Sequence, residues 1–137
     1  MTENEILDMA EMYADFSPDQ STKIGCVIAK DGVAIGVGYN RPMMSVSPDL
    51  PRSEKYHYYF HAEQVALMHA LMRGHDPTGA SLYLSQWLPC SECAKLICEA
   101  GIHEVVTKSP DVPERWQASI DATLNLFGHF NIGVRTA

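Results

Sequence analysis

Three side chains that bind transition metals stand in two short segments of the sequence. His61 opens the tripeptide HAE, and Cys90 and Cys93 form the Cys-x-x-Cys of the pentapeptide PCSEC. One imidazole and two thiolates make three zinc ligands, which leaves the fourth tetrahedral position to a water molecule. Such an open position is typical of catalytic rather than structural zinc sites. We therefore expect Zn²⁺ to be bound by His61, Cys90 and Cys93.

A carboxylate follows the histidine by two residues. Zinc lowers the pKa of a bound water towards about 7 and so makes hydroxide available at neutral pH. A hydrolytic reaction at that water also needs a group that takes up a proton and delivers it to the leaving group. Glu63 shares a helix start with His61 and can sit beside the water without binding the metal. We predict that Glu63 is the catalytic proton shuttle.

Both segments are expected at helix N-termini. Helical periodicity runs from Ala62 to Arg73, and a second helix is expected over 91–100, closed by Gly101. A helix N-terminus favours negative charge, so it lowers the pKa of nearby cysteines and promotes thiolates. Pro89 suits the start of the second helix.

The other elements follow from capping, periodicity and turn signals. Thr2-x-x-Glu5 is a capping box, and the helix that it opens should stop near Ser17-Pro18. Asp31-Gly32 separates two β-branched runs and predicts a hairpin of residues 23–30 and 33–37. The remaining expectations are a Pro-rich functional loop over 39–60 that holds Tyr56, strands at 81–85, 105–107 and 131–134, and a helix at 113–127. Strands alternating with helices predict an α/β fold with a mixed sheet covered on both faces.

Composition narrows the class of protein and its partners. The chain has 137 residues, which suits one domain over 1–137, and a net charge of −7. Ten basic residues are scattered among seventeen acidic ones, which argues against nucleic acid as the partner and leaves a small anionic substrate open. No apolar run approaches the ~20 residues that cross a bilayer, and the acidic start is not a targeting peptide. We expect a cytoplasmic protein with no membrane partner.

Each motif has a simpler interpretation when taken alone. A Cys-x-x-Cys can be redox-active or half of a structural zinc site. A zinc knuckle without catalysis is the main alternative for the full set. Against it, no further Cys or His stands at suitable ligand spacing, and Glu63 would have no role.

His-x-Glu followed by Pro-Cys-x-x-Cys is the signature of zinc-dependent nucleobase deaminases. Four stretches of the chain extend this similarity in the same order: STKIGCVIAKDGVAIGVGYN, EKYHYYFHAEQVAL, GASLYLSQWLPCSECAKLICEAGIHEVV and ERWQASIDATL. With them the chain resembles the deoxycytidylate (dCMP) deaminase family. The resemblance implies a three-layer α/β/α sandwich around a five-stranded mixed sheet, deamination of dCMP to dUMP with release of ammonia, and a homo-oligomer.

The resemblance also implies substrate contacts. Asn40 corresponds to an asparagine that contacts the sugar or phosphate, and Ile24 would pack on the base. The amide of Ala62 and the carbonyl of Leu88 or Pro89 would read the pyrimidine edge. Trp87 beside the cysteine motif is a candidate wall of the base pocket, with core packing as its alternative.

Two positions depart from the family pattern. Val65 replaces an asparagine that often follows the glutamate by two residues. Arg41 replaces the glycine after Gly-Tyr-Asn, as in tRNA adenosine deaminases. It is a candidate phosphate ligand beside Asn40, with a solvated loop cation as its alternative. The alternatives to dCMP are therefore another small substrate (cytidine, cytosine, guanine, a modified dCMP) or a tRNA adenosine.

Overall fold

A five-stranded sheet forms the centre of the molecule. The computed structural model describes residues 1–137, apart from the side chain of Tyr56, which therefore lies outside the described part. The strand order is β2-β1-β5-β6-β7. The strands are β1 (Gly25–Lys30), β2 (Val33–Tyr39), β5 (Ser81–Leu84), β6 (Glu104–Thr107) and β7 (Gly133–Thr136). The first three pair antiparallel and the last three parallel, so the predicted mixed sheet is confirmed.

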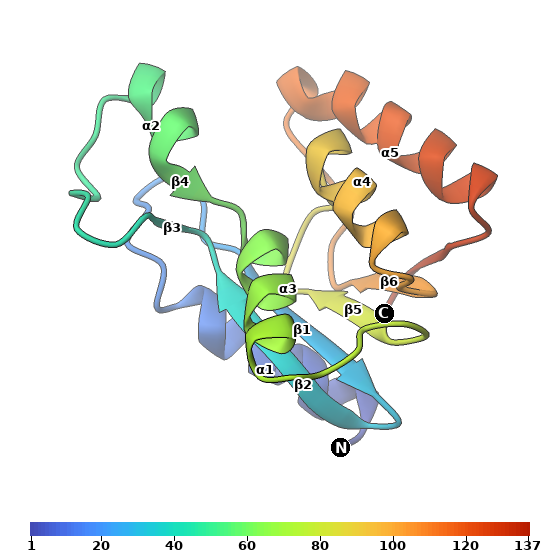
Figure 1. Cartoon of the computed structure of the whole chain (residues 1–137). Helices are drawn as coiled ribbons and strands as arrows, with labels where there is room; N and C mark the ends of the chain where they lie inside the picture. Colours follow the sequence, from blue (N-terminus) through green and yellow to red (C-terminus); the bar gives the residue numbers. More distant parts are fainter.

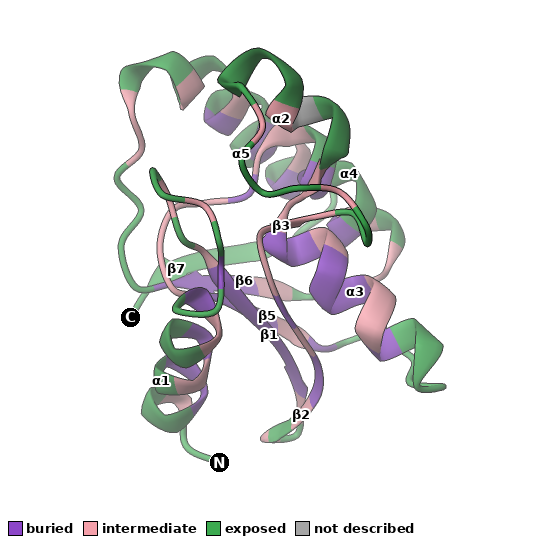
Figure 2. Cartoon of the chain, turned by 90° about the vertical axis from the view of Figure 1, so that its left-hand side faces the viewer, coloured by how far each residue is buried: buried purple, intermediate pink, exposed green. Residues whose placement is uncertain are grey.

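Helices cover both faces of the sheet. Helix α1 (Glu3–Ala14) lies on one face, and α3 (Ala62–Met72), α4 (Ser91–Glu99) and α5 (Gln117–His129) lie on the other (Figure 1). One apolar cluster joins α1 to the strands through Ile6, Leu7 and Val27, and a larger one joins the other face to α3 and α4. Figure 2 shows the buried residues concentrated on the central strands. None of the helices described is both long and apolar enough to span a bilayer.

The local signals in the sequence form the structures that they predict. The Thr2 hydroxyl accepts a hydrogen bond from the N–H of Glu5 at 3.2 Å, and the Glu5 carboxylate accepts one from the N–H of Thr2 at 3.0 Å. Asp31 and Gly32 both adopt positive φ angles, 53° and 75°. That combination is required by the type I′ turn of a two-residue hairpin. The α1 start and the β1–β2 hairpin are therefore specified by neighbouring residues.

Helix α3 lies directly against strand β2, with no side chain between the two backbones at Gly38. A Cβ atom at Gly38 would lie 2.7 Å from the amide nitrogen of Ala66 and 2.9 Å from the carbonyl oxygen of Ala62. Gly36 is even more crowded, since its Cβ would lie 2.3 Å from the Ala66 oxygen. Both glycines are needed because only a residue without a Cβ permits this approach. The position of the first turn of α3, which carries His61, Ala62 and Glu63, depends on it.

The segment over 39–60 differs from the predicted plain loop. It contains a two-residue ladder between β3 (Arg41–Pro42) and β4 (Tyr59–Phe60), and a short helix, α2 (Arg52–Tyr58). The prediction missed them because these elements are short and carry no clear periodicity. Helix α2 stands beside the end of the sheet, across from α5 in Figure 1.

After Pro110, the last helix and the last strand begin at other residues than the sequence predicted. A 3₁₀ turn, η1 (Glu114–Trp116), precedes α5, and the last strand begins at Gly133 rather than at 131. The reason for the later start is a helix cap. Asn131 adopts φ 57°, and the N–H of Ile132 donates to the Phe127 carbonyl at 2.9 Å, so residues 130–132 close α5.

Candidate active site

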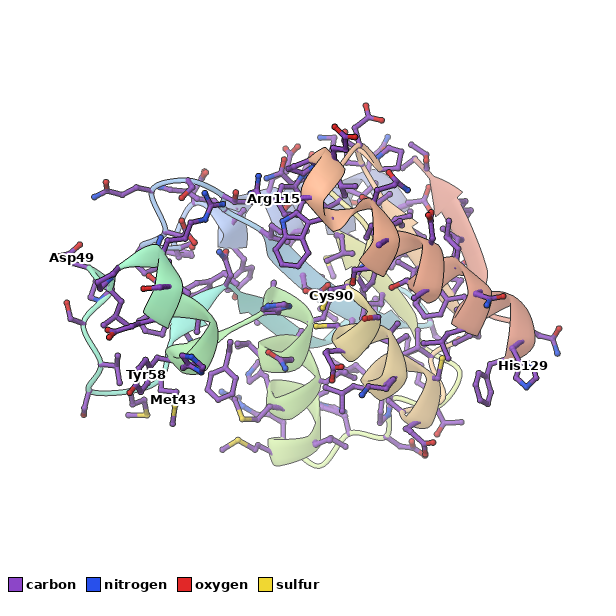
Figure 3. All side chains as sticks on the ribbon, turned by 90° about the horizontal axis from the view of Figure 1, so that it is seen from above. Met43, Asp49, Tyr58, Cys90, Arg115 and His129 are labelled. Carbon is purple, nitrogen blue, oxygen red and sulfur yellow. The ribbon has the colours of Figure 1, made fainter. Side chains whose placement is uncertain are left out.

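The three expected metal ligands converge at the starts of two helices. His61 is the N-cap of α3, Cys90 is the N-cap of α4, and Cys93 lies in the first turn of α4. Their ligand atoms all lie within 4.8 Å of one another. Figure 3, seen from above, places Cys90 between the starts of α3 and α4. The backbone N–H of His61 donates to the Gln64 side chain at 2.8 Å, which holds this turn.

The distances fit a zinc ion. His61 Nδ1 lies 3.4 Å from Cys90 Sγ and 3.3 Å from Cys93 Sγ. Two ligands bound tetrahedrally at the usual Zn–N and Zn–S lengths are about 3.5 Å apart. Two sulfurs and one nitrogen also suit Zn²⁺ better than the harder Mg²⁺ or Ca²⁺, which prefer oxygen. The donor set and its spacing therefore match a three-residue zinc site with one open position.

The electrostatics of the three side chains are coupled. Hydrogen bonds from Cys93 and His61 lower the pKa of the Cys90 thiol to about 4, although that thiol is partly buried. Donating to Cys90, together with burial, raises the pKa of Cys93 well above its usual value. The hydrogen bond to Cys90 raises the pKa of His61 to about 8. Because zinc takes thiolates and neutral imidazole, metal binding here is linked to proton release.

Glu63 is a buried carboxyl beside this cluster. It is 5% exposed and lies in the first turn of α3. Burial raises its pKa above the usual value, and the positive charge of His61 opposes that shift. Carboxyls with raised pKa values serve as general acids and bases, since both protonation states are accessible near neutral pH.

A cavity of about 140 Å³ opens onto the cluster. His61, Glu63 and Cys90 lie at its metal end. The expected substrate contacts Asn40, Ile24, Ala62, Leu88 and Trp87 also line it. Arg41 and Pro89 are absent from the lining as described. The structure thus brings five of the seven expected substrate contacts together with the ligands and Glu63.

Asn40 shapes the cavity wall through its own side chain. Its Oδ1 accepts a hydrogen bond from the N–H of Ile24, and its Nδ2 donates to the carbonyl of Thr22, each at 2.9 Å. Asn40 makes a third hydrogen bond through its backbone, because the Ser17 hydroxyl donates to the Asn40 carbonyl at 2.7 Å. Asn40 therefore holds the segment over 22–24 in place, with Ile24 and Thr22 facing the cavity.

Arg41 is engaged elsewhere. Its guanidinium lies 5.6 Å from the centre of the Phe60 ring, and Nη1 donates to the Pro42 carbonyl at 3.2 Å. The contact with Phe60 joins β3 to β4, whereas the hydrogen bond to Pro42 lies within β3. The cations that line the cavity are Arg52, Lys55 and Arg115.

Residues 1–109 match the family model of the cytidine and deoxycytidylate deaminase zinc-binding region. The chain belongs to this family. The match includes both segments of the metal cluster and the carboxyl between them. The family model describes a zinc-binding region, so Zn²⁺ is the metal of this site.

Two mammalian relatives are similar over most of this chain. It is 36% identical to mouse deoxycytidylate deaminase over 111 residues and 34% identical to the human one over 125 residues. These alignments cover 74% and 84% of this chain but 61% and 66% of the relatives. The chain thus spans less than two thirds of their length. An uncharacterised deaminase in the luxG 3′ region of Aliivibrio fischeri is 30% identical over 131 residues, covering 92% of this chain and 86% of that protein.

Solved structures share the fold of this chain. The dCMP deaminase of cyanophage S-TIM5, in complex with dCMP and dUMP, superposes with a TM-score of 0.83 at 22% identity, covering 100% of this chain and 99% of that one. Its apo form gives a TM-score of 0.81 at 19% identity, covering all of both chains. The expected three-layer α/β/α sandwich around a five-stranded sheet is confirmed.

Helix α5 fixes the turn that carries Cys90. The buried Thr123 hydroxyl donates to the Pro89 carbonyl at 2.7 Å, and the Ser119 hydroxyl accepts from the N–H of Ser91 at 2.9 Å. The Pro89 carbonyl is therefore engaged by α5. The sequence left open whether the carbonyl of Leu88 or that of Pro89 reads the pyrimidine edge. Of these two residues, Leu88 lines the cavity.

Sequence reasoning missed the wall that precedes and begins α5. Arg115, Trp116 and Ile120 line the cavity, with Arg115 labelled near the start of α5 in Figure 3. The stretch ERWQASIDATL carries these residues, but their spacing resembles any amphipathic helix. Trp87 lies on the lining too and adopts φ 67°, while its N–H donates to the Ser109 carbonyl at 2.6 Å. Positive φ at a bulky residue costs free energy and is concentrated at functional sites.

Proposed function

We propose that this protein catalyses the zinc-dependent hydrolytic deamination of a cytosine nucleotide, dCMP, to dUMP and ammonia. The observation that carries the proposal is the cavity, which joins a three-ligand zinc cluster and a buried carboxyl to three cationic side chains. The human and mouse relatives are deoxycytidylate deaminases, and the cyanophage enzyme was solved with dCMP and dUMP, which supports this substrate.

His61, Cys90 and Cys93 are proposed to hold the metal. When bound, zinc acts as a Lewis acid that lowers the pKa of a coordinated water. Glu63 takes a proton from the attacking water and passes protons to the ring nitrogen and to the departing ammonia. The exocyclic C–N bond of cytosine breaks, a C=O bond replaces it, and one water is consumed per ammonia released. The burial of Glu63 keeps its pKa raised, which suits a group that must accept and return a proton.

The neutral part of the cavity is proposed to hold the base and sugar. Ile24 packs against the pyrimidine, while the amide of Ala62 and the carbonyl of Leu88 read its edge. Trp87 forms a side wall. Asn40 acts on the sugar side and at the same time keeps the wall segment in place through Ile24 and Thr22.

The phosphate is proposed to lie against Arg52, Lys55 and Arg115. This replaces the role expected for Arg41, which stacks on Phe60 instead. Each charge-assisted contact contributes about 1.5–3 kcal/mol. Two such contacts would separate the nucleotide from the bare nucleoside by at least two orders of magnitude in kcat/KM.

An ammonia-release screen tests the proposal. The zinc-loaded protein is assayed with dCMP, deoxycytidine, CMP, cytosine, guanine and a tRNA adenosine substrate. We expect dCMP to have the highest kcat/KM, and Arg115→Ala to reduce that value far more for dCMP than for deoxycytidine. Arg41→Ala serves as the matched arginine control outside the cavity lining. Faster turnover of guanine, deoxycytidine or the tRNA would overturn the dCMP assignment.

We also propose a cytoplasmic homo-oligomer. Leu71 and Met72 at the end of α3 and Leu96 on α4 are 58%, 80% and 45% exposed, and large exposed apolar side chains on adjacent helices suit contacts between subunits. A cytosolic location suits a site that needs two reduced cysteines. Light scattering on the purified protein tests the oligomer, and a monomer at micromolar concentration would contradict it.

A further inference from the structure

One carboxylate on the cavity has no part in the proposed deamination. Asp19 lines the cavity and its side chain is 14% exposed. Its Oδ1 accepts hydrogen bonds from the N–H groups of Ser21 at 2.8 Å and Thr22 at 3.3 Å. The same oxygen lies 3.4 Å from Lys55 Nζ. A single carboxylate oxygen thus holds both a wall segment of the cavity and one of the three cations.

This ion pair joins two parts of the chain that are far apart in sequence. Lys55 belongs to α2, whereas Asp19 lies in the loop between α1 and β1. The loop itself is held by Ser17, whose hydroxyl accepts from the N–H of Asp19 and donates to the Asn40 carbonyl. Asp19 is therefore fixed in position before any ligand arrives. The Lys55 ammonium also lies 5.7 Å from the centre of the Tyr59 ring, which limits where it can move.

Asp19 remains ionised in this setting. Burial opposes the charge, but the two backbone N–H donors and Lys55 outweigh it and keep the pKa of the carboxyl below its usual range. At neutral pH the cavity therefore contains a fixed negative charge beside its cations. Such a charge works against anion binding, so its presence in a site proposed to bind a phosphate needs a reason.

The net charge of the side chains that line the cavity supplies a reason for the Asp19 carboxylate. Apart from the metal end with His61, Glu63 and Cys90, the charged residues among the lining described are Asp19, Arg52, Lys55 and Arg115. Three cations and one carboxylate leave a net charge of +2. A phosphate monoester carries about −1.5 to −2 at pH 7. A triphosphate carries about twice that charge, and its outer phosphates would meet both a shortage of cations and the Asp19 carboxylate.

We propose that Asp19 is a specificity-determining residue, which limits the positive charge available to the phosphate and so makes the site selective for a nucleoside monophosphate over its triphosphate. This inference rests on the proposed function, because it concerns the same cavity. It is an instance of selectivity by repulsion, in which a site is built to disfavour the wrong ligand as well as to bind the right one.

Asp19→Asn is the direct test, since asparagine keeps a side-chain oxygen for the Ser21 and Thr22 amides and loses only the charge. Asp76→Asn is the matched control. The Asp76 carboxylate accepts a hydrogen bond from the N–H of Thr78 at 3.0 Å in a similar turn, its backbone carbonyl accepts one from Lys30, and it is not part of the cavity lining described. The measurement is kcat/KM for dCMP and for dCTP with the zinc-loaded enzyme.

We expect Asp19→Asn to raise the ratio of dCTP to dCMP kcat/KM by about tenfold, which is the effect of one partly screened unit charge. Asp76→Asn should leave the ratio within about twofold, as is usual for surface substitutions. Lys55→Met, which leaves a net charge of +1, should lower the ratio below that of the parent. An unchanged ratio in Asp19→Asn, or the same change in Asp76→Asn, would overturn the inference.

A second measurement separates this inference from the proposed function. Thermal unfolding is followed with inorganic phosphate and with tripolyphosphate, which need no cytosine recognition. Relative to both the parent and Asp76→Asn, the Asp19→Asn variant should gain more stabilisation from tripolyphosphate than from phosphate. If the parent does not deaminate dCMP but this difference appears, the proposed substrate is wrong and the charge selection stands. If dCMP is deaminated and the difference is missing, the charge selection is wrong.

Discussion

Replacing Gly38 by alanine would place a methyl group between β2 and α3. The new Cβ would lie 2.7 Å from the Ala66 nitrogen, 2.8 Å from Val65 Cβ and 2.9 Å from the Ala62 oxygen, where ordinary van der Waals contact starts at 3.4 Å. Two of these atoms are backbone, so no side chain can rotate away. The first turn of α3 must therefore move off the sheet by about half an ångström or more, since packed interiors have little free space.

The displacement should affect both stability and catalysis. Overpacking of this kind costs about 1–3 kcal/mol, which corresponds to a drop of roughly 3–12 °C in Tm for a chain of this size. Ala62 lies between His61 and Glu63, whereas Cys90 and Cys93 are carried by α4 and would stay in place. The relative movement of ligands and proton shuttle should lower kcat/KM by about tenfold to hundredfold, since misplacement by an ångström can cost a hundredfold.

Three measurements check this prediction: calorimetric unfolding, zinc affinity by competition with a chelator, and kcat/KM for dCMP. Gly128→Ala in α5 is the matched control, because a Cβ there meets no atom within 4 Å. Alanine in place of a helical glycine should stabilise the protein by about 0.5–1 kcal/mol and leave zinc affinity and kcat/KM unchanged. The reasoning is refuted if Gly38→Ala unfolds at the parent's Tm with unchanged zinc affinity and turnover.

Four further substitutions probe the site itself. Cys90→Ser and Cys93→Ser should each lose the single zinc per chain and lower Tm, because metal binding contributes to folding; metal analysis checks this, and zinc retained by both variants would contradict the ligand assignment. Glu63→Gln should keep zinc and fold while kcat falls by about 10²–10⁴-fold; a loss smaller than tenfold would remove Glu63 from the proton transfers. Thr123→Val should cost about 1–3 kcal/mol, since the buried Pro89 carbonyl loses a donor at 2.7 Å. That variant should also bind zinc more weakly. Unfolding curves recorded with and without a chelator measure both the loss of stability and the loss of metal affinity. Unchanged metal affinity would show that α5 does not position the turn that carries Cys90.

Much of the framework follows from interactions between residues close in sequence. The capping box at Thr2 and the hairpin turn at Asp31-Gly32 form as predicted because their hydrogen bonds and φ angles involve residues at most three positions apart. The boundaries of the last strand were wrong for a related reason. The cap at Asn131 depends on how α5 ends, and an asparagine cap is less distinctive than a glycine cap.

The metal set could also be predicted from the sequence. Cys90 and Cys93 lie one helical turn apart, so a helix start at this position points both sulfurs to one side. His61 and Glu63 share the start of α3 in the same way. Residue type then limits the chemistry, because a histidine and two cysteines with an adjacent carboxylate suit a zinc site with an open position better than other known uses.

The rest of the cavity lining was decided only by the tertiary structure. Arg41 follows Asn40 directly in sequence yet stacks on Phe60, whereas Arg115 reaches the cavity from a segment more than fifty residues after α3 begins. The Pro89 carbonyl is engaged by Thr123, a partner 34 positions away. Such contacts leave no periodic or turn signal, because they depend on how whole helices pack on the sheet. For that reason the sequence alone predicted the cluster of metal-binding side chains with Glu63 nearby, while packing determined which other residues line the cavity.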